Sequence, residues 1–170
     1  MTRQIGEHLV AAELGRMGLI ATPFAGNVPN FDLLVANEFG IAIPVQVKAI
    51  NGPSWQFNAT SFIDIENTNG VQRIVGPKQV PYPGLICVFV LLRGAGTDEF
   101  FVMRFRDLQD YFVGTYKAGI RPKNPNSTHC AIWPKDLQQF KSWAPLFEAL
   151  SNEESALMLR SRGQPTAGKV

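Results

Sequence analysis

The sequence predicts a single α/β domain with an N-terminal helix, a mixed sheet of at least four strands, and C-terminal helices. Two patterns predict this class. Apolar residues recur at helical spacing near the start of the chain, and an unbroken apolar run over residues 85–92 has the length of a buried strand. The chain has 170 residues, of which 45% are hydrophobic, enough for one core. We assign residues 1–150 to this domain and residues 151–170 to a partly disordered C-terminal extension.

The first elements are a helix followed by strands. Val10, Leu14 and Met17 fall on one arc of a helix over residues 4–18, and Gly18 is typical of a helix end. The strands that follow are expected over residues 19–24, 31–36 and 41–50. A turn at 37–40 should join the last two strands as a hairpin.

The second half is expected to begin irregularly. Residues 55–66 show β-like alternation in places and residues 67–83 are rich in Gly, Pro and Asn, so we expect an irregular segment over 51–83 that could contain one short helix. Strands over 85–92 and 99–105 should then form a hairpin. The remaining expectations are a helix over 106–117, a loop over 118–128, a short strand over 129–133, a helix over 136–150 that 151–160 could extend, and a disordered tail over 163–170.

The composition limits the classes of protein. Because the sequence has no run of about 18 apolar residues and no signal-peptide layout, we expect a cytoplasmic protein without a membrane partner. Cys87 and Cys130 are too few for a disulfide framework, and no Cys/His spacing predicts zinc. A net charge of +2 is not that of a protein that coats nucleic acid, but it is compatible with an enzyme that holds nucleic acid in a local groove.

Two carboxylates are candidate site residues. Glu7 lies on the apolar arc of the first helix, where a buried carboxylate needs a partner. A rolled helix that leaves Glu7 exposed in its first turn is the alternative, and for Glu7 taken alone it is the more common situation. Asp32 begins the second strand, where a turn-closing Asp is also common.

Gln46 and Lys48 give the sharper signal. They are two residues apart in a strand otherwise made of Ile, Val, Ala and Pro, so both side chains face the same way. A Lys in the middle of such a strand needs a partner. The alternative is an edge strand whose outer face is exposed to solvent.

The order of these residues resembles that of the PD-(D/E)xK nuclease superfamily, which has the restriction-endonuclease-like fold. The likeness covers about the first third of the chain, through Gly6-Glu7, residues 30–35 and Val45-Gln46-Val47-Lys48. It implies an αβββαβ core with a mixed sheet, to which this chain would add a β-hairpin and C-terminal helices.

Two positions depart from the pattern of the superfamily. The Pro-Asp pair appears as Pro29-Asn30-Phe31-Asp32, so only the Asp is kept, and Gln46 stands at the usual acidic position. A Gln there is similar to Mrr-like restriction enzymes. Holliday-junction resolvases use a helix Glu like Glu7.

The resemblance implies a metal-dependent endonuclease that hydrolyses phosphodiester bonds, most simply in DNA. Its catalytic residues would be Glu7, Asp32, Gln46 and Lys48. Asp32, Gln46 and Glu7 would bind Mg²⁺ or Mn²⁺, which take oxygen ligands. Lys48 would position the attacking water and stabilise charge on the phosphate. A double-strand cutter of this size would be expected to act as a homodimer.

Weaker candidates and other functions stay open. Arg73, Lys78, Arg121 and Lys123 are expected in loops that could contact phosphates, and ordinary solvated charges are an equally good interpretation. A catalytically inactive nuclease-fold module, binding nucleic acid or a protein partner in a DNA-processing or defence complex, is the main alternative. In a plain interaction domain, the four marked residues would be scattered in space.

Overall fold

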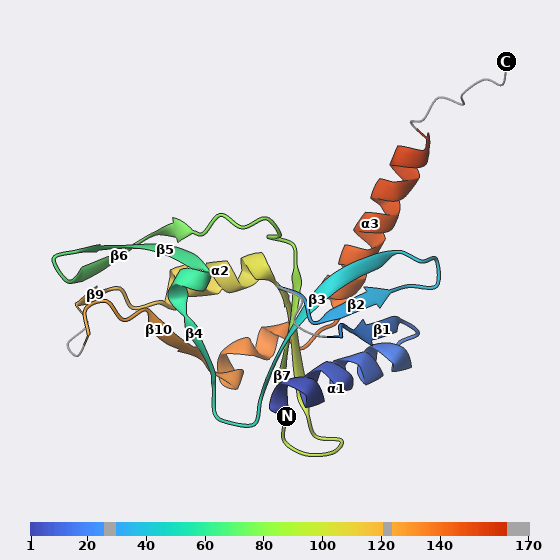
Figure 1. The fold of residues 1–170 in the computed structure, drawn as a ribbon, viewed down its shortest axis with the longest axis horizontal. Coiled ribbons are helices and arrows are strands. Elements are labelled where there is room, and N and C mark those ends of the chain that lie inside the picture. Colours follow the sequence, from blue (N-terminus) through green and yellow to red (C-terminus); the bar gives the residue numbers. More distant parts are fainter. Residues whose placement is uncertain (26–29, 121–123, 163–170) are drawn as a thin grey trace.

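A computed structural model describes residues 1–25, 30–120 and 124–162 (Figure 1). The fold is mixed α/β, with a five-stranded sheet in the order β1-β2-β3-β7-β8. Its strands are β1 (Ile20–Pro23), β2 (Leu33–Ala36), β3 (Ala42–Ile50), β7 (Ile86–Leu91) and β8 (Glu99–Arg104). The helices are α1 (Thr2–Arg16), α2 (Phe105–Thr115), α3 (Ala144–Arg162) and the 3-10 helices η1 (Ala59–Ser61) and η2 (Pro134–Phe140).

The sheet contains both expected hairpins. β2 pairs antiparallel with β3, and β7 pairs antiparallel with β8. β3 and β7 run parallel in the centre, with Val47 beside Val88. Parallel neighbours need a crossover connection, because the chain must return to the same end of the sheet.

The crossover segment between β3 and β7 shows that the prediction for residues 51–83 is wrong. The segment forms β4 (Trp55–Asn58), η1, β5 (Ile63–Thr68) and β6 (Val71–Pro77) instead of irregular chain. β4 pairs with β10 (His129–Ile132), which confirms the expected strand near 129–133. β5 pairs with β6, and β6 pairs with the two-residue β9 (Gly119–Ile120), which lies inside the stretch expected to be a loop.

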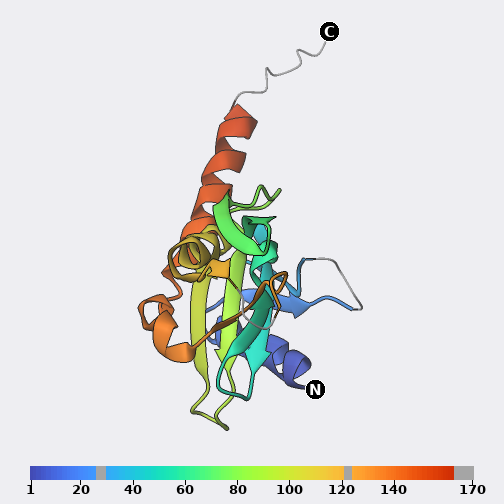
Figure 2. The same ribbon diagram turned by 90° about the vertical axis from the view of Figure 1, so that its left-hand side faces the viewer.

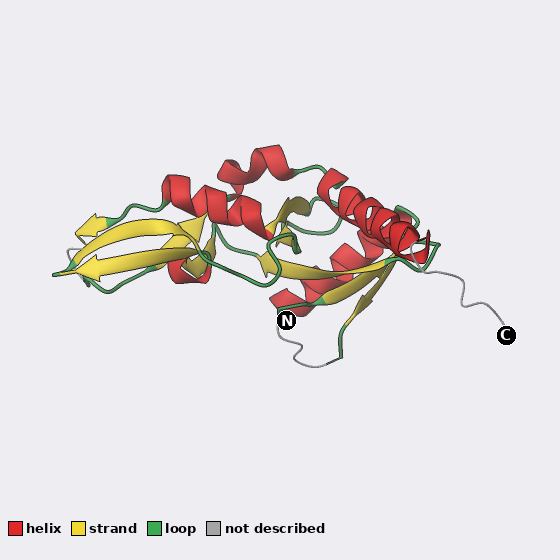
Figure 3. Ribbon diagram, turned by 90° about the horizontal axis from the view of Figure 1, so that it is seen from above, coloured by secondary structure: helices red, strands yellow, loops and turns green. Residues whose placement is uncertain are grey.

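The β5–β6 ribbon, made of β5 and β6, extends from one end of the molecule, opposite the end reached by α3 (Figure 3). The ribbon turns at Asn69 and Gly70, whose φ angles are 52° and 82°. Asn-Gly is a strong sequence signal for a tight hairpin, because both positions tolerate positive φ. The sequence therefore contained a signal for the turn of the ribbon but no clear signal for its strands.

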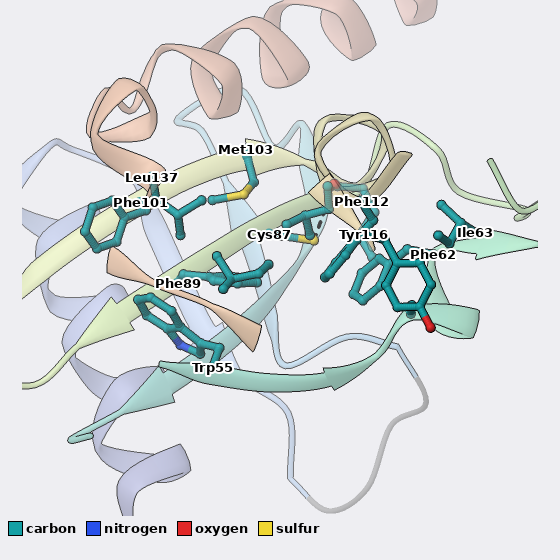
Figure 4. Packing of buried hydrophobic residues seen from close by; sticks show 14 of the residues in the cluster. Trp55, Phe62, Ile63, Cys87, Phe89, Phe101, Met103, Phe112, Tyr116 and Leu137 are labelled. Carbon is teal, nitrogen blue, oxygen red and sulfur yellow. Dashed lines mark hydrogen bonds between the residues drawn. The ribbon is translucent and has the colours of Figure 1, made fainter. Parts of the chain in front are cut away.

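Alternate residues of β7 point into two separate cores. Ile86, Val88 and Val90 join an aliphatic core with α1 and α3, in which every fully buried member is Val, Leu or Ile. Cys87, Phe89 and Leu91 join an aromatic core on the other side of the sheet, seen in Figure 4. That second core is covered by α2, η2, β4 and β10.

The expected helix over 136–150 is also wrong. The chain forms η2 up to Phe140 and then begins α3 at Ala144. Pro145 explains the break, since a proline fits the first turn of a helix but disrupts an interior. Leu146 and Leu150 of α3 lie in the aliphatic core, and the helix then projects beyond the sheet (Figures 1 and 2). None of the helices in the described ranges combines the length and hydropathy that crossing a membrane requires.

Candidate active site

Glu7 is brought to the sheet by a close contact between α1 and β3. A Cβ added to Gly6 would lie 2.4 Å from the Cβ of Ala49 and 3.6 Å from a methyl carbon of Val47. Only a residue without a side chain allows the helix to approach this closely. The next residue, Glu7, is thereby placed against the sheet and is only 8% exposed. The core-facing interpretation of Glu7 is confirmed.

Asp32 stands where β2 and β3 separate, just before β2 begins at Leu33. Its backbone N–H donates to the carbonyl of Val45 at 2.9 Å. Its side-chain Oδ2 accepts the backbone N–H of Val47 at 2.8 Å. The carboxylate therefore accepts a backbone N–H of β3 at a position where no β2 residue pairs with it. Asp32 is only 8% exposed. It is a buried side chain fixed to β3.

Arg3 joins the two carboxylates and was not identified from the sequence. Its Nε donates to Glu7 Oε1 at 2.8 Å, and its Nη2 donates to Asp32 Oδ1 at 2.8 Å. The hydrogen bond to Glu7, together with the charges of Asp32 and Glu7, raises the pKa of Arg3, so the guanidinium stays charged. The spacing of four residues between Arg3 and Glu7 is a helix-pair signal that pointed to the first of these contacts.

Gln46 and Lys48 face the other side of β3, as predicted. Both are half-buried, while Val45 and Val47, which alternate with them along the strand, are buried in the aliphatic core. They line a cavity of about 600 Å³ on the aromatic side of the sheet. Within the described ranges, the Lys48 ammonium has no hydrogen bond or ion pair, and the cavity lining contains Lys48 and Lys78 but no acidic residue. The cavity therefore suits an anionic group.

The backbone of β3 links the two parts of the site. Val47, whose N–H binds Asp32, lies between Gln46 and Lys48 in the chain. Glu7 and Asp32 meet at Arg3, whereas Gln46 and Lys48 open into the cavity. The structure thus brings Glu7 and Asp32 together at Arg3 and places Gln46 and Lys48 at the cavity, and the Asp32–Val47 hydrogen bond is the link between the two pairs.

The donor atoms of this site fit a hard cation in their chemistry. Oxygens of Glu7 and Asp32 already converge on one cation, the guanidinium of Arg3. The amide oxygen of Gln46 is the third oxygen donor on this stretch of chain. Carboxylate and amide oxygens are ligands of Mg²⁺, which usually keeps several waters and needs few protein ligands. In the part of the chain that the structure describes, no group of three or more His, Cys, Asp and Glu side chains gathers.

The four weaker candidates have different surroundings. Lys78 lines the cavity and its Nζ donates to the Thr60 carbonyl at 3.0 Å. Arg73 was expected in a loop, but it lies in β6, exposed and opposite Glu66 of β5. Arg121 and Lys123 lie outside the described residues.

Cys87 is a buried free thiol. Burial raises its pKa to about 12. The thiol is therefore neutral at ordinary pH, which does not suit a nucleophile.

Comparison with known proteins gives one structural relative. No protein-family model matches the sequence. No curated protein matches it either. Among solved structures, the chain is similar to a bacterial homing endonuclease, I-Ssp6803I, with 15% identity and a TM-score of 0.43 over 91% of this chain and 94% of that one.

Proposed function

We propose that this protein is a metal-dependent endonuclease that hydrolyses phosphodiester bonds in DNA, with a PD-(D/E)xK type of site. The observation that carries the proposal is the convergence of Glu7 and Asp32 on one cation, with Asp32 anchored to β3 between Gln46 and Lys48. Two acids, an amide and a lysine are the groups that metal-assisted phosphodiester hydrolysis uses.

Each residue has a role that follows from its position. Asp32 and Glu7 would hold Mg²⁺ or Mn²⁺, with the Gln46 amide oxygen as a neutral ligand. The metal, when bound, supplies a polarised phosphate oxygen and a more acidic water. The Asp32 carboxylate keeps its orientation because Val47 binds its second oxygen.

Lys48 acts from the cavity side of β3. Its ammonium has no partner among the described residues, so it is available to a phosphate oxygen or to the attacking water. Lys78 at the same cavity would contribute a further phosphate contact. A homodimer would bring two such sites to a duplex, one for each strand.

Cleavage assays test this function. Plasmid and single-stranded DNA are incubated with Mg²⁺ or Mn²⁺ and wild type, Lys48→Ala or Lys135→Ala. Lys135 is an exposed lysine of η2 and serves as the control. We expect metal-dependent cleavage by wild type and Lys135→Ala, and a loss on the order of a thousandfold in Lys48→Ala, as for the removal of one group that stabilises a transition state.

Two results would contradict the proposal. Equal cleavage by Lys48→Ala and wild type would remove Lys48 from the site. No cleavage by any variant, with calorimetry showing no metal binding, would favour the inactive nuclease-fold module, for which retained DNA binding would then be measured.

A further inference from the structure

Arg3 stands where the proposed function needs a metal ion. Its guanidinium binds one oxygen of Glu7 and one oxygen of Asp32, both at 2.8 Å. These two carboxylates are the proposed metal ligands. A metal ion that bound them would need the same oxygens, and two cations in one small space repel each other.

We propose that Arg3 is a built-in counter-ion of the metal site, and that a divalent metal ion binds by displacing its guanidinium from Glu7 and Asp32. This inference rests on the proposed function, because it concerns the same two carboxylates. It gives Arg3 a regulatory role, because in the metal-free protein the Arg3 side chain occupies the carboxylate oxygens that the metal ion needs.

Burial shows which partner would move. The side chains of Glu7 and Asp32 are 11% and 8% exposed, whereas the Arg3 side chain is 59% exposed. Asp32 is also fixed through its second oxygen by the Val47 N–H. The carboxylates therefore form the stationary frame, and Arg3 can leave into solvent with little loss of packing.

The charges also favour an exchange. Two ionised carboxylates buried side by side need positive charge nearby. A single guanidinium leaves the group of three with a net charge of −1, whereas a divalent ion in its place neutralises both carboxylates. Arg3 cannot leave by losing its proton, because a guanidinium stays charged in proteins. Displacement of the whole side chain is the remaining route.

Calorimetric titration of DNA-free protein with Mg²⁺, and separately with Mn²⁺, tests this exchange without relying on activity. Wild type is compared with Arg3→Gln and Arg3→Lys. We expect Arg3→Gln to bind either ion about tenfold more tightly, because binding no longer breaks two partly exposed ion pairs. Arg3→Lys keeps a charge but loses the two-pronged contact, so its affinity should lie between the other two.

Arg16→Gln is the matched control. Arg16 lies on the same helix, is 75% exposed, and pairs with Glu13 outside the site. Its substitution changes the net charge of the protein equally, and we expect wild-type metal affinity. Thermal unfolding gives a second readout: added Mg²⁺ should raise the Tm of Arg3→Gln by more than that of wild type.

The outcomes separate this proposal from the proposed function. Metal affinity in Arg3→Gln that is unchanged, weaker, or matched by Arg16→Gln would overturn the exchange, and metal-dependent cleavage by wild type would still uphold the nuclease. Absence of metal binding to all these variants would overturn both. If Arg3→Gln did not fold, the same comparison would be made with Arg3→Lys, where affinity at or below that of wild type would overturn the exchange.

Discussion

The two faces of the central sheet are built differently. On the side of α1 and α3, the buried residues are all aliphatic and the packing is close enough that Gly6 touches Ala49. On the side of α2 and β4, the core is aromatic and borders a cavity of about 600 Å³. The close-packed face brings Glu7 against the sheet, and the open face leaves room for a ligand beside Lys48.

This difference indicates that the two faces of β3 have different roles. β3 presents Val45 and Val47 to the aliphatic core and Gln46 and Lys48 to the cavity. Glu7 lies on α1, whereas Asp32 lies just before β2 and is held to β3 by the Val47 N–H. Variants on the two sides should therefore have different consequences.

The largest expected effect on stability lies on the aromatic face. Phe89 is buried. The centroid of its ring lies 5.1 Å from the ring centroid of Trp55 and 5.7 Å from that of Phe57. Phe89→Ala should lower the free energy of unfolding by about 3–5 kcal/mol, because it removes a large buried side chain. Urea denaturation measures this. Phe39→Ala, at a position 69% exposed, is the control and should change the free energy by less than about 0.5 kcal/mol.

A smaller effect is expected where α1 touches the sheet. Gly6→Ala would force a Cβ to within 2.4 Å of the Ala49 Cβ, and should cost about 1–3 kcal/mol through overpacking. Gly15→Ala on the same helix meets nothing within 4 Å and should be neutral or stabilising by up to about 1 kcal/mol. Thermal or urea unfolding compares the two, and equal effects would show that the contact at Gly6 is not tight.

A further effect concerns pH and the Cys87 thiol. Its pKa is raised from 9.0 to about 12 in the folded protein, mainly by burial. The thiol ionises earlier in the unfolded chain, so its contribution to stability is complete below pH 9 and is lost as pH rises toward 12. The loss approaches about 1.4 kcal/mol per pH unit.

The measurement is urea unfolding of wild type and Cys87→Ala at about pH 8 and about pH 10.5. Wild type should lose more stability over this interval than the variant. Other groups that titrate there are shared by both proteins and cancel in the comparison. Parallel losses in the two proteins would mean that Cys87 is accessible to water in the folded state.

Regular, apolar elements were predictable from the sequence. The run at β7, the alternation in β3 and the periodicity of α1 all reflect burial on one or both faces, which selects apolar residues at fixed spacing. β6 was missed because its alternation is weak: Val71 and Val75 stand at exposed positions, and the buried Gln72 is polar. Pro145 and Asn69-Gly70 were the local signals that would have corrected the reading.

The candidate site was predictable in its members but not in its electrostatics. Glu7, Gln46 and Lys48 could be chosen because polar residues at apolar positions stand out, and Asp32 because its place in the order resembles the superfamily pattern. Arg3 could not, because an exposed arginine near the start of a helix is ordinary in sequence. Its contact with Asp32 joins residues 29 positions apart and exists only once α1 lies against β3.

The central claim is that Asp32 serves a metal-dependent nuclease site rather than the fold alone. Asp32→Asn removes the charge but keeps an oxygen that can accept the Val47 N–H. The decisive measurement is Mg²⁺-dependent DNA cleavage by Asp32→Asn and wild type, with both shown to be folded by circular dichroism. The account predicts a folded variant that has lost both metal binding and cleavage. A folded variant that cleaves DNA like wild type would contradict it.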